Sequence, residues 1–310
     1  REAPDSVDLR AMKRPPRRWI PALRTLTFAL ALSLAAGCSA TDGTDSSRSD
    51  GDAADAPSLP AALWHDVTGE LLDSTGEWTN KVELADLNGD GRLDLLFANG
   101  GDYSTPGEPE MNRAFYARDG APFEDATARV FGSAPDLTRV IKAADLTGDG
   151  AVDVFVGNTY QTRSRLFVGD GAGGFTEETA ARLPSMPLSL GDAEAGDIDG
   201  DGDLDLVLAD WGPGNNMTND GGRTRLWLND GSGRFTDATA ARMPDARVRF
   251  SWDLEFVDTD NDLDLDVLVS CKRCAGGFLF RNDGTGTFES DRRGLPQYTN
   301  NYEYEAMDLD

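Results

Sequence analysis

The sequence predicts an all-β protein made of repeated four-stranded units, and three observations predict it. An acidic loop begins at residues 86, 145, 197, 258 and 308, with spacings of 59, 52, 61 and 50. An aromatic-led segment keeps almost the same spacings, 59, 52, 60 and 53, and begins at Trp64, Phe123, Phe175, Phe235 and Phe288. Each unit has room for four short strands, with no helical periodicity between units. Repeats of this length with four antiparallel strands favour a β-propeller, here an incomplete one of about four blades plus the start of a fifth.

The amino-terminal segment predicts export. We expect residues 1–11 to lie upstream of the true start and residues 12–37 to be a signal peptide, because Met12 precedes a cluster of basic residues. The apolar run 25–36 is too short to span a bilayer. It ends in Leu-Ala-Ala-Gly-Cys38, which resembles the bacterial lipobox. The sequence therefore predicts a lipoprotein anchored through Cys38 to the outer membrane or cell surface, and an ordinary cleaved signal is the alternative.

The composition separates a tether from a folded body. Residues 38–60 are rich in Ser, Asp, Gly, Thr and Ala and lack large apolar side chains, so we expect a disordered tether. Residues 61–310 form the predicted propeller. The formal net charge of −26, from 55 acids and 29 bases, argues against nucleic acid and anionic lipid surfaces as partners. We expect membrane contact through the lipid anchor only.

Within each unit the strands are predicted in order. A first strand such as 82–85 leads into the acidic loop. The second is an almost unbroken apolar run, which indicates a strand covered on both faces, at 93–98, 152–156, 204–209 and 265–269. The third ends at an Asp-Gly turn, a strong hairpin signal, and spans 114–118, 165–168, 225–228 and 277–281. The aromatic-led segment is the fourth.

The acidic loops offer oxygen ligands at positions 1, 3, 5 and 9, as the EF-hand loop does at its first three alternate positions. The predicted side-chain ligands are Asp86, Asn88, Asp90 and Asp94; Asp145, Thr147, Asp149 and Asp153; Asp197, Asp199, Asp201 and Asp205; and Asp258, Asp260, Asp262 and Asp266. Position 7 is expected to coordinate through its backbone carbonyl, at Arg92, Ala151, Asp203 and Asp264. A flexible, carboxylate-rich cage favours calcium over magnesium, and the absence of His and Cys from the loops argues against zinc.

Loop and turn together resemble a known family. The pattern Asp-x-(Asp/Asn)-Gly-Asp-Gly-x-x-Asp, followed by Leu-Trp-Leu-Asn-Asp-Gly-x-Gly-x-Phe, resembles the FG-GAP/VCBS repeat found in the integrin α-subunit head. The resemblance covers about residues 61–310. It implies propeller blades, usually seven to a ring, with calcium in the hairpin between the first two strands. The chain stops inside a fifth loop, at Asp308 and Asp310, so we expect a carboxy-terminally truncated fragment.

The four complete loops are unequal. The third has four carboxylates and both glycines, and we expect it to bind calcium best. The fourth has Leu263 where glycine belongs, and a leucine with positive φ is strained, so this site is expected to be distorted or empty. The alternative for all four is an Asp/Gly-rich turn without metal, in which the carboxylates would repel one another.

The expected function is binding or adhesion on the face opposite the acidic loops. Insertions at 99–112 and 210–222 fall on that face, and exposed loops often carry recognition of a protein or glycan. The candidate partner-binding residues are Tyr103, Trp211, Asn215, Asn216 and Met217. Tolerated insertions without a role are the alternative.

An enzyme is the rival class. The one histidine, His65, has poor context for a triad, and no carboxylate pair stands out as acid and base. We therefore predict no catalysis in this fragment. The alternative is a propeller domain of a larger exported enzyme, acting on polysaccharide or phospholipid, whose catalytic part is missing. Glu83, Glu194, Glu255 and Glu305, with Lys142 in the remaining unit, precede the loops by three residues. If the first strand lines a central channel they would ring it with acid, and ordinary solvated strand positions are the alternative.

Two cysteines remain besides Cys38. Cys271 and Cys274 lie in the turn after the fourth apolar run. In an exported protein we expect them to form a small disulfide, with free thiols or metal and redox chemistry as alternatives.

Overall fold

The computed structural model describes residues 66–72, 76–102, 104–214, 219–274, 276–295, 298 and 303–304. The chain divides into two units, Arg1–Ala62 and Leu63–Asp310, and every described residue belongs to the second. The predicted signal peptide, Cys38, the predicted tether and His65 therefore lie outside the described residues. Among the residues that are described, no helix is long and apolar enough to cross a membrane.

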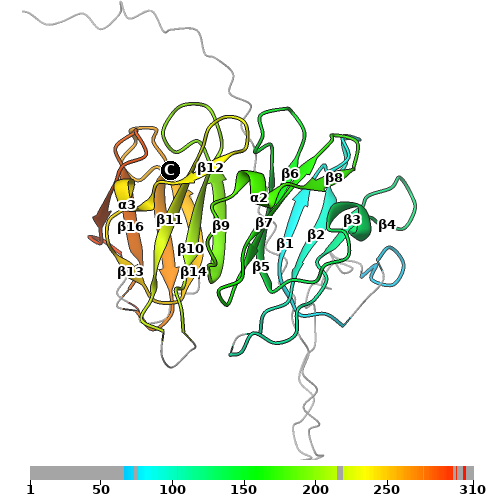
Figure 1. The fold of residues 1–310 in the computed structure, drawn as a ribbon, viewed down its shortest axis with the longest axis horizontal. Coiled ribbons are helices and arrows are strands. Elements are labelled where there is room, and N and C mark those ends of the chain that lie inside the picture. The colour runs from blue at the N-terminus through cyan, green and yellow to red at the C-terminus, as the bar shows by residue number, and fades with distance from the viewer. Residues whose placement is uncertain are drawn as a thin grey trace, which may run out of the picture. The chain divides into compact units, whose positions relative to one another are not determined.

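The second unit contains four antiparallel sheets, each with its strands in chain order (Figure 1). The first sheet holds β1 (Thr79–Ala85), β2 (Asp94–Asn99), β3 (Arg113–Tyr116) and β4 (Glu124–Asp125). The second holds β5 (Thr138–Ala144), β6 (Asp153–Asn158), β7 (Arg165–Gly169) and β8 (Phe175–Glu177). The third holds β9 (Leu190–Gly196), β10 (Asp205–Asp210), β11 (Gly222–Asn229) and β12 (Phe235–Asp237), with β13 (Arg247–Val248) paired to β11. The fourth holds β14 (Ser251–Val257), β15 (Asp266–Cys271), β16 (Phe278–Asn282) and β17 (Phe288–Asp291).

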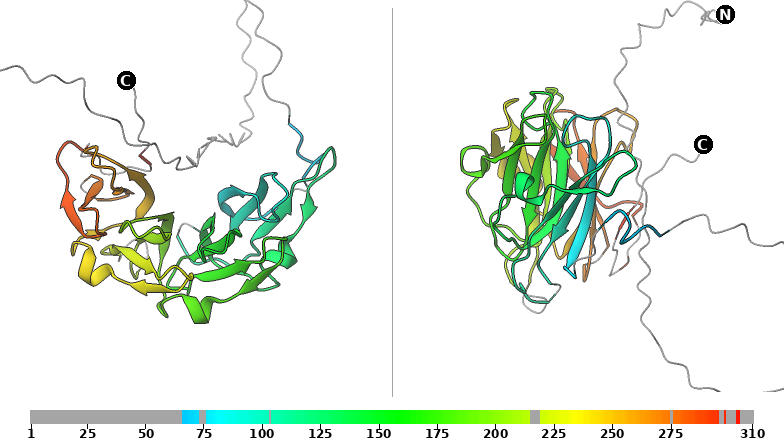
Figure 2. Two further views of the ribbon diagram at one scale, coloured as in Figure 1. Left: turned by 90° about the horizontal axis from the view of Figure 1, so that it is seen from above. Right: turned by 90° about the vertical axis from the view of Figure 1, so that its right-hand side faces the viewer.

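These sheets are the blades of an incomplete propeller, as the repeat predicts. Strand β1 packs against β5, β5 against β9, and β9 against β14, so the first strands of the four blades share one inner side. Figure 2 shows the blades following one another in chain order. A single helical turn follows the fourth strand in three blades: α1 (Thr127–Val130), α2 (Thr179–Arg182) and α3 (Thr239–Arg242).

The second strands form the core between blades. Every residue of β6, β10 and β15 is buried, which confirms the prediction from their continuous apolar runs. In β2 the side chains of Leu95 and Phe97 are only half-buried. These two side chains are less buried because β2 belongs to the first described blade, which has a described neighbouring blade on one side only.

The first strands share an irregularity near their amino ends. The pairing with the second strand skips one residue in each of the first three blades, at Asn80, Arg139 and Gly191. In the fourth blade it skips Trp252 and Asp253. Such bulges kink a strand and re-aim side chains. All four lie at the end of the inner side that is remote from the acidic loops.

Candidate metal centres

The acidic loops join the first two strands of each blade, and their first aspartate organises the turn. In the second loop Asp145 Oδ1 accepts hydrogen bonds from the backbone N–H groups of Gly148 (2.8 Å) and Asp149 (3.1 Å), and Oδ2 accepts one from Gly150 (2.9 Å). The first loop has two of these bonds, from Asp90 and Gly91 to Asp86. Each loop thus wraps its own backbone around the carboxylate at position 1.

The fourth loop keeps this geometry despite its substitutions. Asp258 accepts hydrogen bonds from the N–H groups of Asn261 (2.7 Å), Asp262 (3.2 Å) and Leu263 (3.0 Å). Leu263 has φ of 76°, close to the 89° of Gly150 at the same position, and its side chain is exposed. The left-handed leucine is therefore present as expected, whereas the expected distortion of the loop is absent from its hydrogen bonds.

Two loops gather three carboxylates around one point. The oxygens of Asp197, Asp199 and Asp201 lie within 4.8 Å of one another, and so do those of Asp258, Asp260 and Asp262. Burial, followed by the charges of its two neighbours, raises the pKa of Asp199. Its Oδ1 atom is buried and has no hydrogen-bond partner among the described residues. Clustered oxygens, one of them unpartnered, suit a divalent cation with oxygen ligands.

The aspartates at position 9 serve the loop differently. Each begins the second strand, is almost fully buried, and has Oδ2 bonded to a backbone N–H within its loop, from Leu87 to Asp94 in the first (2.9 Å). Each Oδ1 accepts from the end of the third strand, from Asn229 to Asp205 in the third blade (2.8 Å). Burial raises the pKa of Asp205 to about 6. These four residues, Asp94, Asp153, Asp205 and Asp266, stand outside the two carboxylate groups, and their role as metal ligands stays a prediction.

The remaining predicted ligands differ in their neighbours. In the first loop the Arg92 guanidinium bonds to Asp90 Oδ2 (2.9 Å) and to Asp119 Oδ2 (2.9 Å). In the fourth loop Arg281 Nη1 contacts Asp260 Oδ2 at 2.7 Å. In the third loop the charge of Arg242 opposes the rise in the pKa of Asp199 that burial causes, and the rank of this loop as the best site stays a prediction. At position 7, the N–H groups of Arg92, Ala151, Asp203 and Asp264 donate to the aspartate at position 5.

The first two acidic loops also pack against the next blade. A Cβ atom added to Gly89 would lie 2.8 Å from the Gly171 carbonyl oxygen, and one added to Gly148 would lie 3.1 Å from that of Gly231. Gly171 and Gly231 belong to the Asp-Gly turns of the following blades. The acidic loops and these turns therefore share one rim, as the strand order predicts.

On the opposite face only one of the candidate partner residues, Trp211, is described. Trp211 is 5% exposed rather than displayed on a loop, because its indole stacks on Trp252 and its Nε1 donates to the Ser251 carbonyl (2.5 Å). The expectation of an exposed Trp211 is wrong. The other four, Tyr103, Asn215, Asn216 and Met217, lie outside the described residues, as do Asp308 and Asp310.

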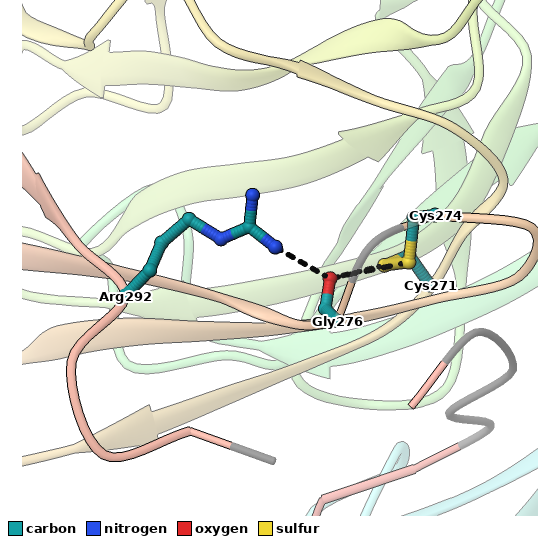
Figure 3. Close-up of a disulfide and its surroundings, with 4 residues drawn as sticks. All are labelled: Cys271, Cys274, Gly276 and Arg292. Carbon is teal, nitrogen blue, oxygen red and sulfur yellow. Dashed lines mark hydrogen bonds between the residues drawn. A yellow bond between two sulfur atoms is a disulfide. The ribbon is translucent and has the colours of Figure 1, made fainter. Parts of the chain in front are cut away.

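The two cysteines form a disulfide three residues apart, shown in Figure 3. Cys271 ends β15 and is buried. The Gly276 carbonyl oxygen lies 3.0 Å from the Cys271 sulfur and 3.2 Å from the Cys274 sulfur, and accepts a hydrogen bond from Arg292 Nη2 (3.4 Å). The turn is thereby closed around Lys272 and Arg273.

The blades and rim loops define a repeat protein of propeller type, and sequence comparison gives its family. The FG-GAP-like repeat matches residues 86–156, 145–208 and 215–269, more than half of the chain. This chain belongs to the FG-GAP-like repeat family.

Individual relatives are more distant. Cartilage acidic protein 1 of Xenopus tropicalis is 33% identical over 147 residues, which cover 44% of this chain and 22% of that protein. An Agrocybe aegerita lectin, described as specifically recognising non-reducing terminal N-acetylglucosamine, aligns at TM-score 0.38 and 19% identity over 72% of this chain and 52% of its own. The V. cholerae biofilm matrix protein Bap1 aligns at TM-score 0.35 and 16% identity, over 74% and 40%. The chain thus spans about a fifth to a half of the length of these proteins.

Proposed function

We propose that this chain is the calcium-binding propeller segment of an exported surface lipoprotein that acts as a binding or adhesion module. The observation that carries the proposal is the grouping of Asp197, Asp199 and Asp201, with a buried carboxylate oxygen that lacks a partner. Three carboxylates held this close repel one another, and a divalent cation would offset that repulsion.

Calcium in such a loop would act on more than its own hairpin. The loop backbone packs on the turn of the following blade, so a metal-ordered loop presents a fixed surface to that blade. We expect calcium to stabilise the hairpin and its interface with the next blade together. Modest affinity would suffice outside the cytoplasm, where calcium is abundant.

Calorimetric titration of chelator-treated protein tests the metal. We expect saturable calcium binding and a higher melting temperature with calcium than with chelator. Asp199→Asn removes one ligand charge and should abolish the tightest site, whereas Asp245→Asn removes an exposed carboxylate far from the loops and serves as control. The proposal of calcium binding would be refuted if millimolar calcium gave no saturable heat and the chelator left the melting temperature unchanged.

The lipoprotein part of the proposal rests on the lipobox-like sequence before Cys38. When the protein is expressed in a bacterial host with a labelled fatty acid, the label should be incorporated into the wild-type chain and not into the Cys38→Ser variant. Label retained in that variant would exclude the anchor. The name of one relative, Cartilage acidic protein 1, describes an acidic protein of cartilage, and this supports the proposal of an acidic module outside the cytoplasm.

A further inference from the structure

One face of the first sheet is apolar and exposed. This leading face is defined by Val82, Leu84 and Leu93, which are 49%, 45% and 60% exposed. Val82 pairs with Phe97, and Leu84 with Leu95, and both partners are half-buried. Five of the seven large apolar side chains that are exposed among the described residues lie in this blade or just before it: Val67, Trp78, Val82, Leu84 and Leu93. Apolar exposure concentrated in this way marks an interaction surface.

The same face is covered in the three later blades. Ile141 occupies the repeat position of Val82, four residues before the acidic loop, and is only 2% exposed. The residues equivalent to the leading face all pack in clusters with side chains of the preceding blade: Ile141, Ala143 and Val152; Ala193, Ala195 and Leu204; and Leu254, Phe256 and Leu265. The leading face is therefore the side of a blade that receives the blade before it.

The segment 66–72 has the form of the turn that follows a fourth strand. The Val67 carbonyl accepts hydrogen bonds from the N–H groups of Glu70 and Leu71, both at 3.0 Å. In α1, α2 and α3 one carbonyl likewise accepts from the residues three and four further on, and these acceptors are Ala126, Glu178 and Ala238. The turn before the first blade thus repeats the backbone pattern that ends the first three blades.

An aspartate fixes the start of this turn in the same way. The N–H of Thr68 donates to Asp66 Oδ1 at 2.9 Å. The equivalent bonds run from Thr127 to Asp125 (2.8 Å) and from Thr239 to Asp237 (3.0 Å). Because Asp125 and Asp237 are the last residues of β4 and β12, Asp66 stands where a fourth strand ends.

This turn is already joined to the first blade. The Leu71 carbonyl accepts a hydrogen bond from the Phe123 N–H at 2.9 Å, next to β4. Leu71 and Leu72 are half-buried, whereas the equivalent Val130 and Phe131 are buried against the second blade. The chain therefore places the end of a preceding blade beside the leading face.

The missing part of that blade needs three strands and no fourth. Each of the four described sheets has a fourth strand of its own, so a described blade of a second copy would not be completed by the segment 66–72. A further inner strand instead follows within the same chain. Tyr304 has the repeat position of Val82, and a Cβ atom added to Gly277 of the fourth blade would collide with its ring. The series of blades thus continues beyond the fourth in one polypeptide.

We propose that the leading face of the first blade is covered by a further blade of the same polypeptide, encoded after residue 310, and that the segment ending at Asp66 is the fourth strand of that blade. Burial of Val82, Leu84 and Leu93 then completes the interface that the three later blades already have. This contact needs neither metal nor lipid, so it can fail or hold independently of the proposed function.

Cysteine labelling of this 310-residue chain and of the complete gene product, both with Cys38→Ser, tests the proposal. Leu84→Cys should react readily with a maleimide in the 310-residue chain. In the complete protein it should react at least about tenfold more slowly, because a covered thiol reacts only when the blades open. Leu263→Cys, at an exposed position in the fourth acidic loop, is the matched control and should react alike in both proteins.

Side-chain truncation gives a second measurement. Val82→Ala should leave the urea midpoint of the 310-residue chain unchanged and lower that of the complete protein. Ile141→Ala, at the equivalent buried position of the second blade, should lower both midpoints.

The gene itself also decides the matter. A reading frame that ends at residue 310, or a last repeat with an aromatic-led fourth segment of its own, would overturn the proposal. Equal labelling of Leu84→Cys in the two proteins would do the same. A 310-residue chain that sediments as a dimer, with Leu84→Cys protected in that dimer, would overturn it in favour of a second copy on this face.

Discussion

Asn229, the last residue of β11 before the Asp-Gly turn of the third blade, donates a 2.8 Å hydrogen bond from Nδ2 to the backbone carbonyl of Leu146 in the acidic loop of the second. The same nitrogen bonds to the Leu204 carbonyl of its own blade (3.0 Å), and Asn229 Oδ1 accepts from Gly233 (2.9 Å). Asn282 repeats the arrangement one blade later, with Nδ2 bonded to the Ile198 carbonyl at 2.8 Å. One asparagine thus closes its own turn and joins it to the loop of the blade before.

We expect Asn229→Ala to lower the free energy of unfolding by about 1–3 kcal/mol, because it leaves buried backbone groups without partners. Urea unfolding in the presence of calcium measures it, and Asn282→Ala should cost a similar amount. Thr236→Ala, an exposed position in β12, is the control and should stay within about 0.5 kcal/mol. An Asn229→Ala protein as stable as that control would show that the bond across the blades contributes nothing.

Leu263 carries backbone strain that glycine would relieve. With φ of 76° and an exposed side chain, it gains little packing in return. Leu263→Gly should raise the free energy of unfolding by about 1 kcal/mol and strengthen calcium binding in the fourth loop. Leu263→Ala removes the same side chain but keeps Cβ, and so should not relieve the strain. Equal stability of the two variants would mean that the positive φ at position 263 does not lower the free energy of unfolding.

The sequence predicts well what depends on local chemistry. Glycine at position 6, Asp-Gly turns and unbroken apolar runs act through neighbours in the chain, so the four-stranded blades and the shared rim of loops and turns follow from them. Leu263 is an example, because its φ could be read from its place in the repeat.

What the sequence leaves hidden depends on partners far apart in the chain. Trp211 looked like an exposed loop residue, yet it stacks on Trp252 from the next blade. The pairing of Lys81 with Asp192 crosses 111 residues and has no counterpart in the repeat. The bulges at Asn80, Arg139 and Gly191 recur at one end of the inner strands, and no local motif in the sequence announces them.

The ion pair of Lys81 and Asp192 joins the first and third blades on the inner side. Asp192 is fully buried, and its other oxygen accepts from the Leu254 N–H of the fourth blade (3.0 Å). Lys81→Gln should destabilise the fold by about 3–5 kcal/mol, because it removes the hydrogen-bonded cation from a buried carboxylate.

Adding Asp192→Asn to Lys81→Gln should recover part of that loss, since the asparagine carries no charge. A double-mutant cycle by urea unfolding at neutral pH measures the coupling. Strictly additive losses would mean that the two charges act independently.

Asp253, beside the same pair, should make stability depend on pH. Burial and then the charge of Asp192 raise the pKa of Asp253 to about 8, and burial raises that of Glu194 to about 7. Unfolded carboxyl groups titrate near 4, so between about pH 4 and 8 the folded state holds protons that the unfolded state has released. Folding stability must therefore fall as the pH rises through this window, by at most about 1.4 kcal/mol per pH unit for each group.

The variant Asp253→Asn measures the part of this pH dependence that Asp253 contributes. We expect the fall of unfolding free energy between pH 6 and about 8 to become shallower than in wild type, leaving the part that Glu194 contributes up to about pH 7. Urea unfolding at several pH values, at fixed calcium, measures the slope. Asp245→Asn, an exposed carboxylate, should keep the wild-type slope. If Asp253→Asn also keeps it, Asp253 is ionised throughout the range, and the inner side holds its negative charges with Lys81 and Lys142 alone.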